Sequence, residues 1–240
     1  MIKCMKNYGN NNYELSVVLP SYQEEENLRN LLPRLLKTLQ SLGISYEVLV
    51  IDTIDSLDAT KEVCELNKVR YINRRGGNYF GCAVRTGIEE ASGHYVLFMD
   101  ADGSHPPEFI SELFSFANTY EVVIASRYID KGNTENNFAL ILMSRIVNWT
   151  FSIVLDLPFK DVSNSFKIYR GKQLKSLTLI SNNFEIVEEV LVKLRRTYPS
   201  MRFKEVPFVF KKRMFGETKR NLFVFIITYV ITIFKLRFQL

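Results

Sequence analysis

The stretch GCAVRTGIEEASGHYVLFMDADGSHPPEFI (residues 81–110) contains the pattern that decides the fold. Its first part belongs to a predicted helix over 78–92 that ends at a glycine. The run YVLFM (95–99) is apolar at every position, which is typical of a strand buried on both faces of a parallel sheet. Two carboxylates, Asp100 and Asp102, come directly after that strand. The stretch therefore predicts a helix and a strand that lead into an acidic turn.

Apolar runs and segments with helical spacing alternate on both sides of this stretch. The predicted strands cover 15–19, 46–51, 69–72, 95–99 and 121–126. The predicted helices cover 27–42, 58–67, 78–92 and 106–119. Wholly apolar strands that alternate with helices are typical of a mostly parallel sheet with helices on both faces, so we predict an α/β fold. Ligands bind such sheets beyond the carboxyl ends of the strands.

Beyond residue 130 the alternation stops. The predicted elements there are a long apolar helix over 137–155, a strand over 162–170, a helix over 184–196 and a strand over 202–210. Pro207 places the last strand at an edge of the sheet, because proline cannot donate to a ladder. No repeat, low-complexity tract or linker divides the chain. We therefore predict one domain over 1–219, followed by a hydrophobic helix over 220–240.

Composition narrows the possible sites and partners. The 240 residues carry 31 Lys and Arg against 26 Asp and Glu, and the excess is concentrated in KKRMFGETKR (211–220). Such a cluster suits nucleic acid, a phosphate-bearing ligand or an anionic membrane surface, and it is equally typical of a solvated loop. Three scattered cysteines and two histidines argue against a disulfide framework or a zinc site. The N-terminal residues lack the apolar core of a signal peptide, which predicts a cytoplasmic location.

The acidic turn is a candidate metal site. Two carboxylates one residue apart at a strand end can reach a single divalent cation, and hard oxygen ligands suit Mg²⁺ or Mn²⁺. Such a cation would neutralise the charge that develops on a leaving nucleoside diphosphate. Taken alone, an Asp-x-Asp turn is also typical of a loop that caps the next helix. The spacing by itself leaves both interpretations open.

From Leu15 to about Lys219 the chain resembles the family 2 glycosyltransferases, particularly the polyprenyl-phosphate transferases of the dolichol-phosphate mannose synthase type. The segments that carry the resemblance are VVLPSYQEEENL (17–28), VIDTIDSLDAT (50–60), the opening stretch (81–110), SRY (126–128), DVSNSFKIYR (161–170) and FGETKR (215–220). The resemblance implies a GT-A fold. It also implies an inverting transfer of a hexosyl group from a GDP- or UDP-sugar to a polyprenyl phosphate, with Mg²⁺ or Mn²⁺ on the diphosphate.

The resemblance assigns residues to the donor side of such a site. It places Pro20, Tyr22 and Glu24 in a nucleotide-contacting loop, Asp52 at the base or ribose, and Asp100 and Asp102 on the metal. Ser104 stands where relatives often have a glutamine that completes the metal shell, and it is the candidate third ligand. Arg213 and Lys219 match positions that close over the diphosphate or the acceptor. Arg75, beside a Gly-Gly turn, is expected either to contact a phosphate or to be a surface charge.

On the acceptor side, the resemblance assigns Arg127 and Arg145 to the acceptor phosphate, which suits the planar fork of arginine. The alternative for this pair is a salt bridge to a structural carboxylate. Glu189 matches an acid of the family's acceptor helix best, with Glu188 as the neighbouring candidate, and one of the two could be the general base if the acceptor were a hydroxyl.

The segment LFVFIITYVITIF (222–234) is apolar but short for a membrane span, since thirteen helical residues cover roughly 20 Å of about 30 Å of hydrocarbon. We expect it to lie in the membrane interface, which would make the protein peripheral at the inner face of the membrane. The alternatives are a buried helix or a dimer contact. No nucleic-acid partner is expected. Two other functions stay open: transfer to a saccharide or other hydroxyl by the same fold, and a catalytically lapsed binding protein.

Overall fold

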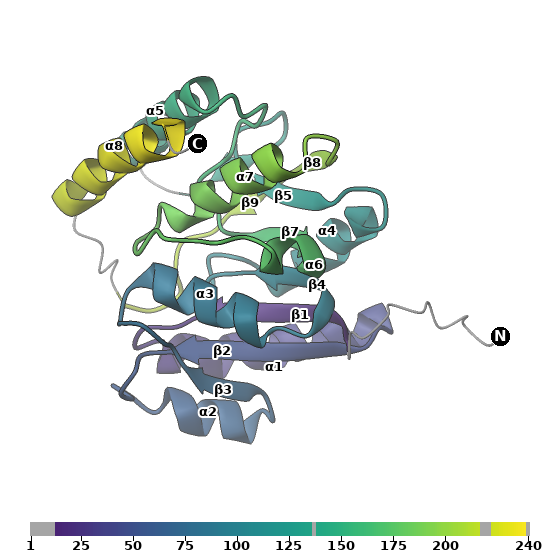
Figure 1. Ribbon diagram of the computed structural model, residues 1–240. Coiled ribbons are helices and arrows are strands. Elements are labelled where there is room, and N and C mark those ends of the chain that lie inside the picture. Colours follow the sequence, from purple (N-terminus) through teal and green to yellow (C-terminus); the bar gives the residue numbers. More distant parts are fainter. Residues whose placement is uncertain (1–12, 136–137, 217–221, 239–240) are drawn as a thin grey trace.

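The core of the protein is one mixed sheet of seven strands (Figure 1). The computed structural model describes residues 13–135, 138–216 and 222–238. The strands are β1 (Tyr13–Pro20), β2 (Tyr46–Asp52), β3 (Arg70–Asn73), β4 (Gly93–Phe98), β5 (Val122–Ser126), β7 (Lys167–Arg170) and β8 (Phe203–Pro207). Their order is β3-β2-β1-β4-β7-β5-β8, and only β7 runs antiparallel to its neighbours. A separate parallel pair joins β6 (Asn133–Thr134) to β9 (Val209–Phe210).

Helices cover both faces of the sheet, as the wholly apolar strands predict. They are α1 (Glu25–Leu42), α2 (Thr60–Leu66), α3 (Phe80–Glu90), α4 (Ile110–Ala117), α5 (Phe138–Val154), α6 (Gly171–Lys175), α7 (Ile186–Thr197) and α8 (Leu222–Phe238), with a 3₁₀ turn η1 (Pro107–Phe109) before α4. Alternate residues of β1 enter two separate cores. Val18 packs in the core that includes α3 and α7, whereas Val17 and Leu19 pack in the core that includes α1 and α4. The predicted α/β fold is confirmed.

The main difference from the predicted elements lies between β5 and α6. The strand predicted over 162–170 is shortened to β7, and residues 161–165 form a turn instead. Polar side chains explain the difference, because Asp161 and Asn164 bond to side chains and backbone groups of neighbouring segments instead of a regular ladder. The edge position predicted for the 202–210 segment is confirmed for β8, which ends at Pro207.

Helices α5 and α8 contact each other at one side of the molecule (Figure 1). Phe151 and Leu155 from the α5 end, and Tyr229 and Leu236 from α8, belong to the same core as α7. Within residues 13–135, 138–216 and 222–238, no helix is both long and apolar enough to cross a membrane. The predicted division into a domain over 1–219 and a separate helix stays a prediction.

Candidate active site

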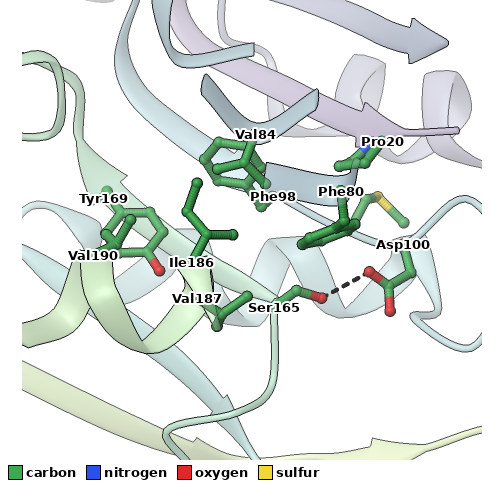
Figure 2. Close-up of a pocket in the computed structure, with 11 residues that line it drawn as sticks. Pro20, Phe80, Val84, Phe98, Asp100, Ser165, Tyr169, Ile186, Val187 and Val190 are labelled. Atoms are coloured by element: carbon green, nitrogen blue, oxygen red, sulfur yellow. Dashed lines mark hydrogen bonds between the residues drawn. The ribbon is translucent and has the colours of Figure 1, made fainter. Parts of the chain in front are cut away.

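The acidic turn lies at the carboxyl end of β4 and is held by hydrogen bonds from three directions. Ser165 Oγ donates to Asp100 Oδ1 at 2.8 Å (Figure 2), and the Asp100 amide donates to His105 Nδ1 at 2.9 Å. The amide of Ser104 donates to Asp102 Oδ1 at 3.0 Å. About a third of the Asp100 side chain stays exposed. Both carboxylates are therefore oriented by the protein and remain within reach of a ligand.

His105 is a structural residue of this turn. Its Nδ1 accepts an amide hydrogen, so the ring carries its proton on Nε2, which lies 3.1 Å from Asn164 Oδ1. Burial lowers the pKa of His105 and favours this neutral form, against the opposing charges of Asp100 and Asp102. Asn164 in turn donates to the carbonyl of Ala125 at 2.7 Å. The ring thus links the end of β4 to the end of β5.

A buried lysine, Lys167, holds the 161–165 turn in place. Lys167 Nζ donates to the carbonyl oxygens of Val162, at 3.0 Å, and of Asn164. Burial lowers the pKa of Lys167 to about 8, although the carboxylates of Asp161 and Glu188 favour its charged form. This lysine holds the backbone from which Asn164 and its neighbour Ser165 reach the acidic turn.

The donor atoms of the acidic turn fit Mg²⁺ or Mn²⁺. Among the described residues, no group of three or more His, Cys, Asp or Glu side chains could hold a metal ion. At the acidic turn, a cation would therefore be bound by the two carboxylates of Asp100 and Asp102. Mg²⁺ is commonly bound through one or two carboxylates, with substrate phosphates and water in its other positions. The hydroxyl of Ser104 is buried and has no hydrogen-bond partner within the described residues. Its role as third ligand stays a prediction.

The basic segment after β9 packs directly on the acidic turn. The amide of Met214 donates to the carbonyl of Asp102 at 2.9 Å, and that of Lys211 donates to the carbonyl of Ser104 at 3.1 Å. Gly103 has a positive φ of 80°, and a Cβ added there would lie 2.5 Å from the Met214 side chain. The segment over 211–215 therefore borders the candidate metal site. Lys219 lies outside the described residues.

The first loop reaches the same place from the other side. Pro20 lines a cavity with Asp100 (Figure 2), and Tyr22 is exposed in the loop that follows β1. Glu24 and Arg213 pair with each other, since Arg213 Nη2 lies 3.0 Å from both carboxylate oxygens. Burial raises the pKa of Glu24, and the charge of Arg213 opposes that effect.

Asp52 ends β2 and is buried beneath the first loop. Tyr71 donates its hydroxyl hydrogen to Asp52 Oδ2 at 3.1 Å, while burial raises the pKa of this carboxyl. The arginine that organises this region is Arg74, which donates to the carbonyl oxygens of Ser21 and Asp52. No sequence signal separates Arg74 from its neighbour Arg75.

Arg75 is at the surface. Its guanidinium forms ion pairs with Glu89 at 2.7 Å and with Glu90 at 2.8 Å, and about half of the side chain is exposed. Of the two expectations for this residue, the structure agrees with the surface charge.

The two arginines assigned to the acceptor meet around one tyrosine ring. The Arg127 guanidinium carbon lies 5.0 Å from the centroid of the Tyr128 ring, and that of Arg145 lies 5.6 Å from it. Arg127 is almost buried and forms a two-point salt bridge with the fully buried Asp161. Arg127 thus forms the salt bridge to a structural carboxylate that was the alternative to binding the acceptor phosphate. Arg145 is exposed on α5, and none of the described residues forms an ion pair with it.

The cavity beside Asp100 has an apolar wall. It is a small, partly open space, and Figure 2 shows side chains of α3, β4 and α7 around it. The apolar side chains that line it are Pro20, Phe80, Val84, Phe98, Met99, Ile186, Val187 and Val190. Asp100 contributes the one carboxylate among the lining residues.

Glu189 does not line this cavity. It is fully buried and accepts hydrogen bonds from the amides of Ile180 and Ser181, at 2.9 and 2.8 Å, while Lys193 Nζ lies 2.6 Å from its Oε1. These contacts keep the carboxylate ionised, because the hydrogen bonds outweigh burial and lower its pKa. Glu189 therefore joins α7 to the turn that precedes it. This location does not support the expectation that Glu189 is positioned as a general base.

The sequence model of the family described as "Glycosyl transferase family 2" matches residues 16–190, which extend from within β1 to beyond β7. The chain belongs to this family. The family 2 glycosyltransferase is 34% identical over 214 residues to a dolichol-phosphate mannosyltransferase of Pyrococcus furiosus, and 29% identical over 218 residues to that of Saccharomyces cerevisiae. Each match covers 86% of this chain, and it covers 59% of the Pyrococcus protein and 80% of the yeast protein.

Solved structures confirm the GT-A fold of the glycosyltransferase. Glucosyl-3-phosphoglycerate synthase of Mycobacterium tuberculosis, in a complex with Mn²⁺, UDP and glucosyl-3-phosphoglycerate, superposes with a TM-score of 0.69 over 94% of this chain and 80% of that chain. The sequence identity is 18%, so this likeness concerns the fold. The same enzyme has also been solved with Mg²⁺ and UDP.

Proposed function

We propose that this glycosyltransferase moves a hexosyl group from a GDP- or UDP-sugar to a polyprenyl phosphate, with Mg²⁺ or Mn²⁺ at Asp100 and Asp102. The relatives named dolichol-phosphate mannosyltransferase support a lipid phosphate as the acceptor. The observation that carries the proposal is the apolar wall of the cavity beside Asp100, to which α7 contributes Ile186, Val187 and Val190.

The side chains of α7 bear on the acceptor in a second way. The two classes of acceptor, a hydroxyl and a phosphate, differ in whether they need a general base. A hydroxyl must lose a proton during the attack and needs a general base within hydrogen-bond reach. A phosphate is already ionised at neutral pH, so it attacks without one. The first candidate for that base on α7, Glu189, is bonded to two amides and to Lys193 instead. Its neighbour Glu188 is buried and accepts a hydrogen bond from the Tyr229 hydroxyl. An acceptor that brings its own charged nucleophile fits this arrangement better.

Each side of the proposed site then has a role. Asp100 and Asp102 would hold the cation, which neutralises the charge on the leaving nucleoside diphosphate. Arg213 borders the turn and supplies a cation that can follow the diphosphate. Arg145 would bind the acceptor phosphate, and Arg127, fixed by Asp161, would orient Tyr128 beneath it.

A polyprenyl phosphate resides in a bilayer, so the proposal also places the protein at a membrane surface. The helix α8 is the segment expected there from the sequence. We propose a peripheral position at the cytoplasmic face.

The test is turnover by the purified protein with Mn²⁺ or Mg²⁺, a panel of GDP- and UDP-sugars, and a detergent-dispersed polyprenyl phosphate present or absent. We expect hexosyl transfer that requires the lipid phosphate. Arg145→Ala should lower kcat/KM by about 10- to 100-fold, since a hydrogen bond to a charged group contributes about 1.5 to 3 kcal/mol. Glu189→Gln should retain most of the turnover per folded molecule.

Other outcomes would assign the protein elsewhere. Transfer to a saccharide without the lipid phosphate, lost in Glu189→Gln and retained in Arg145→Ala, would identify a hydroxyl acceptor. A protein that binds no nucleotide sugar in the presence of metal would be a lapsed enzyme.

A further inference from the structure

Helices α5 and α8 contact each other and pack on the core that includes α7. The rings of Phe151 and Tyr229 meet at a centroid distance of 4.6 Å, and the Tyr229 hydroxyl bonds to Glu188 of α7. Figure 1 shows the two helices side by side at one edge of the molecule. Because the inner residues of both helices are committed to the core, their opposite faces point away from it.

These outward faces are rich in large exposed apolar side chains. On α5 five of them recur every three or four residues, from Phe138 to Ile153, which places these five along one side of the helix. The large exposed apolar residues are Phe138, Leu140, Leu142, Ile146, Trp149 and Ile153 on α5, and Ile231, Phe234 and Phe238 on α8. Two thirds of Trp149 is exposed. Large exposed apolar side chains that gather on two neighbouring helices indicate a contact with a partner or a membrane.

A cationic hollow adjoins the same surface where the C-terminal ends of α5, α7 and α8 come together. It is lined by Arg195 and Arg196 from the last turn of α7, Arg237 from the last turn of α8, and Ile153 of the exposed apolar row. Asp156 is the one carboxylate that lines it. Arginines at helix ends also stabilise the helix dipole, but that role does not require three of them around one hollow.

We propose that α5 and α8 dock on a bilayer and that the hollow formed by Arg195, Arg196 and Arg237 receives the phosphate of an anionic phospholipid headgroup. Guanidinium groups bind phosphate oxygens through paired hydrogen bonds. The neighbouring apolar side chains would enter the boundary between headgroups and acyl chains, as in other helices that lie in a membrane interface. The combination of cations in a hollow with an apolar rim favours such a lipid over a second copy of this chain, which would bring three more arginines to the same contact. This inference extends the membrane position of the proposed function to a defined face of the molecule.

The experiment uses the full chain and vesicles that contain neither polyprenyl phosphate nor donor, so its result is independent of whether transfer occurs. Trp149 is the sole tryptophan of the protein and lies in the proposed contact, so its fluorescence reports on this surface. Binding to vesicles of phosphatidylcholine alone is compared with binding to vesicles that include phosphatidylglycerol, by sedimentation and by the emission maximum of Trp149.

We expect a blue shift of Trp149 and preferential binding to the vesicles with phosphatidylglycerol. Arg195→Gln combined with Arg237→Gln should weaken that binding about 10- to 30-fold, since each basic residue near an anionic membrane contributes about a factor of five. The control combines Arg29→Gln and Arg34→Gln, two exposed arginines of α1 in the other core layer, and should bind as the parent does. Equal binding to both kinds of vesicle, an equal loss in the control, or a Trp149 shift that follows protein concentration without vesicles would overturn the proposal.

Discussion

Glu24 and Arg213 are 189 residues apart in the sequence, yet Arg213 Nη2 lies 3.0 Å from both carboxylate oxygens of Glu24. Asn27 strengthens the junction, because it donates to Glu24 and accepts from the amide of Phe215. The pair therefore joins the loop after β1 to the basic segment that borders the acidic turn. Two residues that the family resemblance assigns to binding of the nucleotide sugar thus form an ion pair with each other.

This pairing predicts opposite effects for the two partners. An arginine that contacts the diphosphate must first leave Glu24. Arg213→Gln should therefore raise the Kd for nucleoside diphosphate in the presence of Mn²⁺ about tenfold, in line with about 1.5 kcal/mol for a charged hydrogen bond. Glu24→Gln removes the competing charge and should leave that Kd equal or lower. Calorimetric titration measures both values, and a raised Kd in Glu24→Gln would mean that Glu24 itself contacts the nucleotide.

Asp102→Asn should abolish metal-dependent binding of nucleoside diphosphate while leaving the fold intact. An amide is a much poorer ligand for Mg²⁺ or Mn²⁺ than a carboxylate, but its oxygen can still accept the hydrogen bond from the Ser104 amide. Circular dichroism checks the fold, and titration of UDP and GDP with and without Mn²⁺ checks the binding. Glu112→Gln, an exposed residue of α4, is the matched control. Metal-dependent binding that survives in Asp102→Asn would remove this residue from the metal site.

Ser165→Ala should weaken the apparent affinity for the metal about tenfold, because residues that orient a metal ligand typically contribute a factor of 10 to 100. The lost contact is the 2.8 Å hydrogen bond to Asp100 Oδ1. Turnover measured against Mn²⁺ concentration should show a raised half-saturation value and recover at high metal. Ser115→Ala, whose hydroxyl bonds only within α4, should show neither effect. A loss of turnover that high metal does not restore would contradict a role in orienting the ligand.

The buried carboxylate of Glu47, far from the acidic turn, is expected to stabilise the fold in a way that is lost in acid. Its carboxylate is buried and accepts hydrogen bonds from Ser16, Ser92 and Arg70. Burial raises its pKa, but these hydrogen bonds outweigh burial, so the pKa in the folded state lies below the ordinary value of 4.5. The stabilisation is therefore complete above about pH 4.5 and is lost as the pH falls through the folded-state pKa.

Glu47→Gln should lower the free energy of unfolding by about 2 kcal/mol at pH 7, as expected for hydrogen bonds to a charged group. The difference from the parent should shrink below pH 4.5, where the parent loses the same charge. Urea denaturation at several pH values measures it. A difference that stays constant down to pH 3 would show that the charge of Glu47 is not the source.

The strands and the acidic turn were predictable because their signals are local. A run such as 95–99 is apolar because both of its faces are covered, and the acids that follow lie where the strand leaves the core. The same logic predicted the buried leucines of α1, since their spacing reflects the helical turn. The family segments added the assignment of Asp100 and Asp102 to a metal, which the spacing of two acids does not give alone and which stays a prediction.

Tertiary contacts explain what local patterns missed. Arg74 and Arg75 are adjacent and chemically identical, yet one is buried under two loops and the other is exposed beside Glu89 and Glu90. Glu189 lies on a helix of the expected kind, but its orientation on that helix commits it to the turn at 180–181. The antiparallel insertion of β7 between β4 and β5 depends on pairing across the whole domain.

The sequence by itself determined the α/β fold, the strand ends where polar residues gather and the family to which the chain belongs. Only the tertiary structure decided that Ser165 orients Asp100, that Asp161 holds Arg127 and that Glu24 holds Arg213. The physical reason is the range of the interactions. Periodicity and turn chemistry act over a few neighbouring residues, whereas these contacts join residues 34 to 189 positions apart and form only when the packed sheet brings strand ends together.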